Sequence, residues 1–283
     1  MTWTDAHHHL WSPNTRAHTW LDGPQMAPIR RDFDLDDLMP EIRAAGVDRT
    51  VLVQVLPDLD ETAEFLALAG SGDLVRGVVG WADLTSADLP EALARLRSGS
   101  GGDRLVGVRH LVQGEPDPGW LSRGDVQRGL RAVAGAGLSY DLLTLPHQLP
   151  AAIDAVRAVP ELTFVLDHLS KPPIRSGELE PWAARIRELA AEPNVFCKLS
   201  GMVTEAGPSG DPRPYAQVVL DAFGPERVMF GSDWPVCLLA ATYAEVTGLA
   251  ETLTSGLTPA ERDQIFDQTA ARAYGLPPRE DQR

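Results

Sequence analysis

Two short segments from opposite ends of the chain carry side chains that could do chemistry together. His7, His8 and His9 lie in the N-terminal run Asp-Ala-His-His-His-Leu-Trp, and Asp233 lies in Gly-Ser-Asp-Trp-Pro. Alternate side chains on a β-strand leave the same face, so His7 and His9 are expected to point together and His8 away from them. Imidazoles and a carboxylate in one place can bind a metal ion or take a proton from an attacking water molecule.

Further polar residues follow short apolar segments at regular intervals. They share a position at or just beyond the end of a predicted strand, and they are Gln54, Trp81, Asp83, Arg109, His110, Tyr140, Asp141, His147, Asp167, His168, Lys198 and Ser200. In a parallel barrel these ends meet on one face, so the polar side chains are expected to converge on one pocket. Single residues have an alternative interpretation as structural side chains, since Tyr140 could belong to the core and Arg109 could pair with a structural carboxylate.

The elements that must position these residues alternate between strand-like and helix-like segments. The predicted strands are short and apolar, as expected for strands buried on both faces. They span 3–6, 50–55, 75–81, 105–110, 139–143, 163–167, 195–199 and 228–231. The predicted helices span 36–45, 61–69, 89–97, 126–136, 149–159, 182–191, 215–223 and 243–254, with a further helix over 259–274.

Strict alternation of this kind predicts an α/β fold, a single (β/α)₈ TIM barrel with an additional C-terminal helix. A doubly wound open sheet is the alternative, and the lack of a Gly-x-Gly-x-x-Gly loop after the first strand weakens it. One domain is expected to account for all 283 residues, with a core over about 4–275 and a polar tail over 276–283. The Pro- and Gly-rich segment 205–214 is predicted as a loop that could act as a lid.

Composition argues against several classes of protein. The formal net charge of −15 disfavours partners such as nucleic acid and anionic membrane surfaces. The sequence has neither a membrane-spanning apolar run nor a signal-peptide pattern, so a cytoplasmic location is expected. Cys197 and Cys237 are too few for a disulfide scaffold. Lysine occurs only at Lys171 and Lys198, which draws attention to both, because arginine does not replace a compact ammonium group.

These groups permit a limited chemistry. Three imidazole nitrogens and one carboxylate oxygen suit Zn²⁺ or a similar divalent ion as ligands. The residues that offer them are His7, His9, His168 and Asp233. Such an ion would lower the pKa of bound water and polarise a carbonyl group. Asp233 could equally act without a metal, as the general base for water attacking an ester. The absence of a Gly-x-Ser-x-Gly motif disfavours a serine nucleophile, so hydrolysis by activated water is the simplest interpretation.

The remaining candidates are expected to bind substrate. Arg109 and Lys198 could hold an oxyanion or a carboxylate. The apolar walls for a ring could be formed by Trp11, Trp81 and Trp234. The full predicted substrate-binding set is Arg109, His110, Lys198, Tyr140, Asp141, Trp81, Trp234 and His147.

Five motifs in order resemble the amidohydrolase-2 group of the amidohydrolase superfamily. They are Asp-Ala-His-His-His-Leu-Trp (5–11), Gly-Val-Arg-His (107–110), Leu-Asp-His-Leu-Ser-Lys-Pro (166–172), Cys-Lys-Leu-Ser-Gly (197–201) and Gly-Ser-Asp-Trp-Pro (231–235). The resemblance extends over about 4–274. Within the group it is greatest to the lactone hydrolases, including those that act on L-fuconolactone, L-rhamnono-lactone and 2-pyrone-4,6-dicarboxylate.

The resemblance implies a TIM barrel whose catalytic residues are His7, His9, His168 and Asp233, with Asp233 as the base. It implies a hydrolase of a small lactone, with no organic cofactor and with one divalent metal ion, zinc above others, or none. No evident bridging carboxylated lysine is present, which argues against a two-metal site. The leading hypothesis is the opening of a sugar-derived 1,4- or 1,5-lactone to the aldonic acid. The alternatives are a non-oxidative decarboxylase of an aromatic or muconate-type acid, a lactonase of a dicarboxylate pyrone or muconolactone, and a non-catalytic binding barrel.

Overall fold

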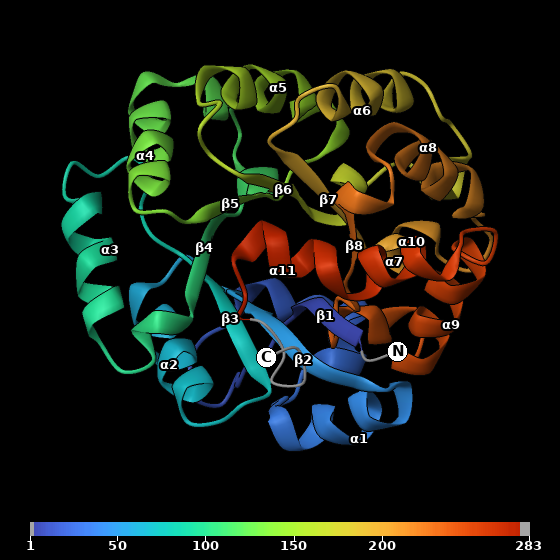
Figure 1. Ribbon diagram of the computed structural model, residues 1–283. Helices are drawn as coiled ribbons and strands as arrows, with labels where there is room; N and C mark the ends of the chain where they lie inside the picture. Colours follow the sequence, from blue (N-terminus) through green and yellow to red (C-terminus); the bar gives the residue numbers. More distant parts are fainter. Residues whose placement is uncertain (1–2, 278–283) are drawn as a thin grey trace.

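Eight parallel strands form a barrel in the computed structural model, which describes residues 3–277. The strands follow the order of the chain and are β1 (Trp3–His8), β2 (Val47–Val53), β3 (Val75–Gly80), β4 (Leu105–His110), β5 (Ser139–Leu142), β6 (Phe164–Leu166), β7 (Val195–Leu199) and β8 (Val228–Phe230). A parallel bridge between His8 and Trp234, with a 2.7 Å hydrogen bond from the His9 N–H to the Trp234 carbonyl, joins the last strand to the first. The predicted TIM barrel is confirmed (Figure 1).

Helices surround the barrel and connect its strands (Figure 1). They are α1 (Leu35–Ala45), α2 (Leu59–Gly70), α3 (Leu89–Ser98), α4 (Gly124–Gly135), α5 (Leu149–Ala158), α6 (Trp182–Ala190), α8 (Arg213–Phe223) and α9 (Tyr243–Leu253). The local sequence sets several of their starts. Asp34 and Thr242 form capping boxes with Asp37 and Glu245, so each satisfies backbone N–H groups that the first turn leaves unpaired.

The prediction of a loop over 205–214 is wrong at both ends. Residues 205 and 206 belong to a short helix after β7, α7 (Met202–Ala206), and residues 213 and 214 begin α8. Pro214 stands in the first turn of α8, where its missing N–H costs nothing. Proline there starts a helix, although the sequence suggested that it marks a loop.

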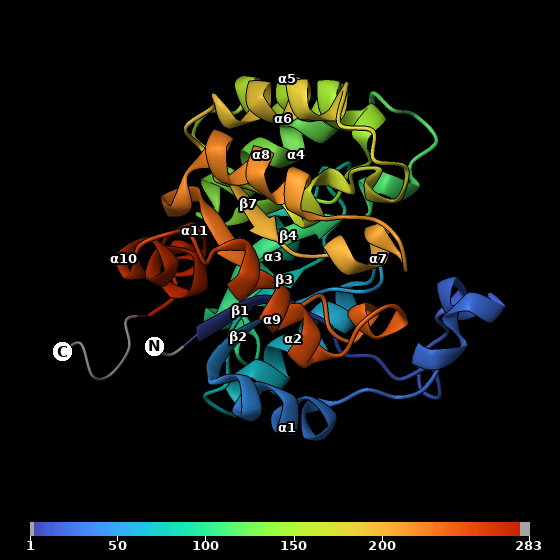
Figure 2. The ribbon, with the colours of Figure 1, turned by 90° about the vertical axis from the view of Figure 1, so that its right-hand side faces the viewer.

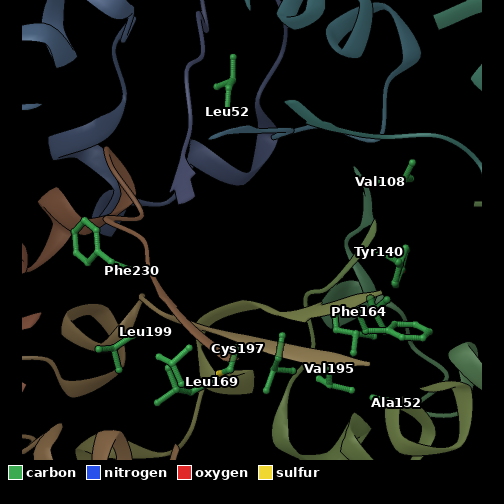
Figure 3. Packing of buried hydrophobic residues seen from close by; sticks show 14 of the residues in the cluster. Leu52, Val108, Tyr140, Ala152, Phe164, Leu169, Val195, Cys197, Leu199 and Phe230 are labelled. Carbon is green, nitrogen blue, oxygen red and sulfur yellow. The ribbon is translucent and has the colours of Figure 1, made fainter. Parts of the chain in front are cut away.

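The core has two layers separated by the strands. Residues that alternate outward along the strands pack against the helices; among them Tyr140 and Phe164 lie side by side outside the barrel wall (Figure 3). A smaller cluster fills the barrel interior and is made by residues from the inner face of the strands and from the C-terminal helix: Ala6, Val51, Val53, Val79, Val165, Met229, Ala270, Ala273, Tyr274 and Leu276. Layered filling of this kind makes the barrel a packed core with its site at one end.

The additional C-terminal helix covers the end of the barrel opposite the long β-to-α loops (Figure 2). It runs through α10 (Pro259–Asp263), a π-turn (Gln264–Gln268) and α11 (Thr269–Tyr274). The Ser139 hydroxyl donates a 2.6 Å hydrogen bond to the carbonyl of Ala273 and ties α11 to β5. Most of the predicted tail, 278–283, lies outside the described residues. Among residues 3–277, no helix combines the length and apolar character needed to cross a membrane.

Candidate active site

Four side chains meet where the strands end. The His7 and His9 Nε2 atoms are 3.0 Å apart. The Asp233 Oδ1 atom lies 3.5 Å from His9 Nε2 and 3.8 Å from the Nε2 atoms of His7 and His168. All four are at least nine-tenths buried. The structure thus places the predicted catalytic residues together, although they come from β1 and the residue that follows it, from the turn after β6 and from the turn after β8.

An irregularity in β1 aims the two histidines into the barrel. Ala6 packs inside the barrel, so regular alternation would turn His7 outward. The pairing of β1 with β2 shifts register between Asp5 and His8, and His7 faces the interior as well. His8 then points away and bonds to the Thr50 hydroxyl (2.9 Å). Such bulges commonly redirect side chains beside active sites.

Two glycines make room for the histidines. A Cβ atom on Gly231 would lie 2.7 Å from the His7 Cβ, and one on Gly201 would lie 2.8 Å from the His168 ring. Real Cβ contacts are essentially never so short. Gly201 also has φ +68°, a left-handed conformation that favours glycine. The glycines of the Gly-Ser-Asp-Trp-Pro and Cys-Lys-Leu-Ser-Gly motifs therefore fit the packing of the site.

Asp5 anchors the loop that carries Asp233, a role that the sequence analysis missed. One carboxylate oxygen accepts hydrogen bonds from the backbone N–H groups of Ser232 (2.9 Å) and His7 (3.1 Å), and the other accepts one from the Tyr243 hydroxyl (3.0 Å). Burial raises the pKa of Asp5 to about 6. The only signal in the sequence is an aspartate two residues before His7.

Hydrogen bonds on their Nδ1 side orient two of the histidines. His9 Nδ1 lies 2.8 Å from the Val53 carbonyl, which can only accept, so we assign the proton of the neutral ring to Nδ1 and a lone pair to Nε2. His168 Nδ1 lies 2.9 Å from the Ser200 hydroxyl. In both rings Nε2 is left to face Asp233.

Burial keeps the site histidines neutral and their neighbours keep Asp233 charged. Burial lowers the pKa of His168 to about 4 and also lowers the pKa of His9. Burial alone would raise the pKa of Asp233. In acid, where His168 and His9 take up protons, the charge of His168 and the hydrogen bond and charge of His9 outweigh burial and hold the pKa of Asp233 below its usual value. A carboxylate that is ionised among neutral imidazoles is equipped to accept a proton.

A buried charge network lies beneath His7. Lys198 Nζ hydrogen-bonds to Asp141 Oδ2 (2.6 Å) and to His7 Nδ1 (3.0 Å), and it forms an ion pair with Asp167 Oδ1 at 3.0 Å. Tyr274 of α11 donates to the Asp141 carboxylate at 2.8 Å. Lys198 and Asp141 are both completely buried.

Lys198 and Asp141, which the sequence predicts to bind substrate, lie beneath His7 and hydrogen-bond to each other. They contact the cluster through His7, and their binding of substrate stays a prediction. The prediction for Tyr140 is wrong. Strand alternation puts Asp141 inside the barrel and its neighbour Tyr140 on the outside, packed against Phe164.

Arg109 borders the site and is held rigidly. Its Nη1 atom lies 3.0 Å from Asp167 Oδ2 and 3.3 Å from His7 Nε2, and its Nε and Nη2 atoms donate to the Gln54 side-chain oxygen at 3.0 and 2.8 Å. The guanidinium is 3% exposed, as a side chain at the floor of a pocket would be. The sequence indicated only that Gln54 is a polar residue at the end of a predicted strand, not that it holds Arg109.

The other predicted binding residues lie in three different environments. Trp81 donates to His110 (3.2 Å), which lies against the Trp120 ring, and both Trp81 and His110 are partly exposed. Trp234 is only 2% exposed and packs edge-on against Phe33, so it belongs to the core and is not the predicted wall. His147 is exposed, and among the described residues no contact joins it to the cluster of three histidines and Asp233.

The donor set of the cluster fits a divalent metal ion. Ligand atoms of His7, His168 and Asp233 all lie within 4.8 Å of one another, and His9 presents its Nε2 lone pair beside them. Neutral imidazoles and a carboxylate are the ligands of zinc sites. Arg109, at 3.3 Å from His7 Nε2, would face the same ion with its own positive charge.

The chain belongs to the Amidohydrolase family, whose model matches residues 4–276. It is 40% identical over 294 residues to the L-fucono-1,5-lactonase of Burkholderia multivorans, covering 99% of this chain and 98% of that one. It is 38% identical over 280 residues to the L-fucono-1,5-lactonase of Burkholderia ambifaria, covering 96% and 95%. The crystal structure of an amidohydrolase from Burkholderia multivorans with bound Zn superposes with a TM-score of 0.91 at 39% identity, covering 98% of this chain and 100% of that one.

Proposed function

We propose that the protein is a hydrolase that opens a sugar-derived 1,4- or 1,5-lactone to the aldonic acid. The observation that carries this proposal is the ionised Asp233 facing three neutral histidines at one end of the barrel. The L-fucono-1,5-lactonases of the two Burkholderia species support the substrate class, because they match this chain over almost its full length. They favour this reaction over the decarboxylase, the dicarboxylate lactonase and the non-catalytic barrel.

In the proposed reaction, Asp233 takes a proton from water as the water oxygen bonds to the lactone carbonyl carbon. The His9 Nε2 lone pair, 3.5 Å from Asp233 Oδ1, holds the other hydrogen of that water. Arg109 supplies positive charge near the developing oxyanion. The ring C–O bond then breaks, and its oxygen takes the proton back from Asp233 to give the hydroxy acid.

Where a metal ion is concerned, His7, His9, His168 and Asp233 are the residues that would hold it. We propose Zn²⁺ as the ion, on the nature of these ligands and on the Zn-bound amidohydrolase of similar structure. Bound there, the ion would polarise the lactone carbonyl and lower the pKa of water.

The test is a panel of five- and six-membered aldonolactones that includes L-fucono-1,5-lactone. Release of one proton per lactone is followed with a pH indicator, and the product is identified as the aldonic acid by NMR. We expect at least one lactone to be hydrolysed far above its spontaneous rate. If no member of the panel is accelerated by either the metal-free or the zinc-supplemented protein, the proposed function is wrong.

A further inference from the structure

Four consecutive residues after β6 adopt a left-handed conformation. His168, Leu169, Ser170 and Lys171 have φ values of +52°, +55°, +58° and +48°, and none of them is glycine. This conformation is disfavoured for residues with a side chain, because the Cβ atom crowds the following carbonyl oxygen. Strain of this kind persists where the surrounding structure enforces it, and it is concentrated at functional sites.

Specific contacts hold this turn in place. The Trp182 indole donates to the Leu169 carbonyl (2.8 Å), and the hydroxyls of Ser170 and Thr144 are 2.8 Å apart. The N–H of Lys171 donates to the His168 carbonyl (2.7 Å), so the turn has the three-residue period of a 3₁₀ helix. Side chains three residues apart eclipse in such a turn. The turn that directs His168 to Asp233 therefore presents Lys171 on the same side.

Electrostatic effects agree with this placement. The positive charge of Lys171 acts on both Asp233 and His168, and it lowers the pKa of each. Lys171 is partly buried and ends the turn that carries His168, so we place its side chain at the rim of the site. It is one of only two lysines in the chain, and the other, Lys198, hydrogen-bonds to His7 and Asp141 beneath the site.

Glu205 lies at the same rim on the neighbouring loop. It belongs to α7, whose N-cap Gly201 lies against the His168 ring and which packs against residues 174–176, just after Lys171, and residues 236–239, just after Asp233. Partial burial raises the pKa of Glu205, the charges of Lys171 and Arg175 oppose that rise, and the charge of Asp233 adds to it. The packing of α7 therefore places Glu205 beside the turn that carries His168 and Lys171.

Neither charge has an ionic partner within the part of the chain that the structure describes. Among residues 3–277, no acidic oxygen lies within the 4.0 Å of a salt bridge from Lys171 Nζ, and Glu205 has no basic partner within that distance. The buried charges below them, Arg109 and Lys198, are fully paired with carboxylates of the protein. A donor and an acceptor of opposite charge that stay apart at the rim leave a gap that a polar ligand can bridge.

We infer that Lys171 and Glu205 are specificity-determining residues that bind hydroxyl groups of the substrate ring, the ammonium donating and the carboxylate accepting. This inference rests on the proposed lactonase function and adds to it a preference for polyhydroxylated over deoxygenated lactones. It also accounts for the strained turn, which places His168 and Lys171 together.

The test compares one hydroxylated lactone that the enzyme hydrolyses with its deoxy analogues, each lacking one hydroxyl. The measured quantity is the ratio of kcat/KM for the full and the deoxy lactone, with a competitive inhibition constant replacing KM for any analogue too slow to follow. The variants are Lys171→Met, Glu205→Gln and Lys171→Arg. Arg213→Met is the matched control, because it removes an exposed positive charge paired only with Asp211.

Lys171→Met and Glu205→Gln should each lower kcat/KM for the full lactone about 10- to 100-fold, mainly through KM, which is the effect of losing one charge-assisted hydrogen bond. For at least one deoxy analogue the loss in kcat/KM should be less than about threefold. The ratio of kcat/KM for the full lactone to that for the deoxy lactone should therefore fall. Lys171→Arg should lie between, and Arg213→Met should match wild type. The inference would be overturned if the variants lost kcat/KM equally on the full and the deoxy lactones. It would also be overturned if kcat/KM of the wild type did not change on removal of any hydroxyl. A wild type inactive on all lactones would instead overturn the proposed function.

Discussion

Asp233 combines two properties that oppose each other in most proteins, since it is buried and yet ionised. Burial penalises its charge, and in acid the protonated rings of His9 and His168, whose Nε2 atoms lie 3.5 and 3.8 Å from Asp233 Oδ1, compensate for that penalty. The same burial keeps those rings neutral at ordinary pH. The base is therefore available over a wide range of pH, because neither partner has to lose a proton near neutrality.

The pH profile of kcat/KM follows from these directions. A base works when deprotonated, so a pKa lowered below its usual value extends activity toward acid. With Asp233 below its ordinary pKa and His168 at about 4, we expect kcat/KM to stay level from pH 8 down to about pH 5 and to fall below that. The measurement is kcat/KM at constant ionic strength, corrected for spontaneous lactone opening. An acidic limb centred near 6.5, the value of an ordinary histidine, would contradict this account.

At the scale of elements, the strand ends were predictable and the contacts between strands were not. Short apolar segments followed by His168 or Asp233 indicate where parallel strands end, and the barrel geometry then brings those residues together. Tyr140 was misplaced because the sequence does not tell which of two neighbours faces inward, and the depth at which Lys198 lies could not be predicted for the same lack of a signal. The role of Asp5 depends on backbone groups of Ser232, which no sequence pattern records.

Gly231→Ala tests the close packing between β1 and the turn after β8. The new Cβ would lie 2.7 Å from the His7 Cβ and 3.3 Å from the Ser200 Cβ, so His7 must move. We expect kcat/KM to fall at least about 10-fold and the free energy of unfolding to fall by about 1–3 kcal/mol. Gly248→Ala on α9 is the control, because a Cβ there meets nothing within 4 Å. Wild-type activity in Gly231→Ala would show that His7 does not need this position.

At the scale of the whole molecule, the C-terminal helix is coupled to the catalytic end through the barrel interior. Tyr274 of α11 donates to Asp141, Asp141 accepts from Lys198, and Lys198 contacts His7. The sequence predicted the helix, but nothing in it indicated that the helix reaches the network beneath the site. That connection requires α11 to cover the barrel end (Figure 2).

Tyr274→Phe tests this coupling. It removes one donor from the buried Asp141 carboxylate, and we expect a loss of about 1.5–3 kcal/mol in the free energy of unfolding measured with urea. Tyr215→Phe is the control, because its hydroxyl donates only to the neutral carbonyls of Pro173 and Glu178. Its expected loss is about 0.5–1.5 kcal/mol. A Tyr274→Phe variant no less stable than Tyr215→Phe would mean that the hydroxyl does little for Asp141.

The most direct test of the central claim is kcat/KM for the best lactone in wild type and in Asp233→Asn. Asparagine keeps the shape of the side chain and cannot accept the proton of water, so we predict a loss of about 10²- to 10⁴-fold, carried by kcat. Thermal unfolding of both proteins shows that the variant is folded. A folded Asp233→Asn protein that retains wild-type kcat would contradict the assignment of Asp233 as the base.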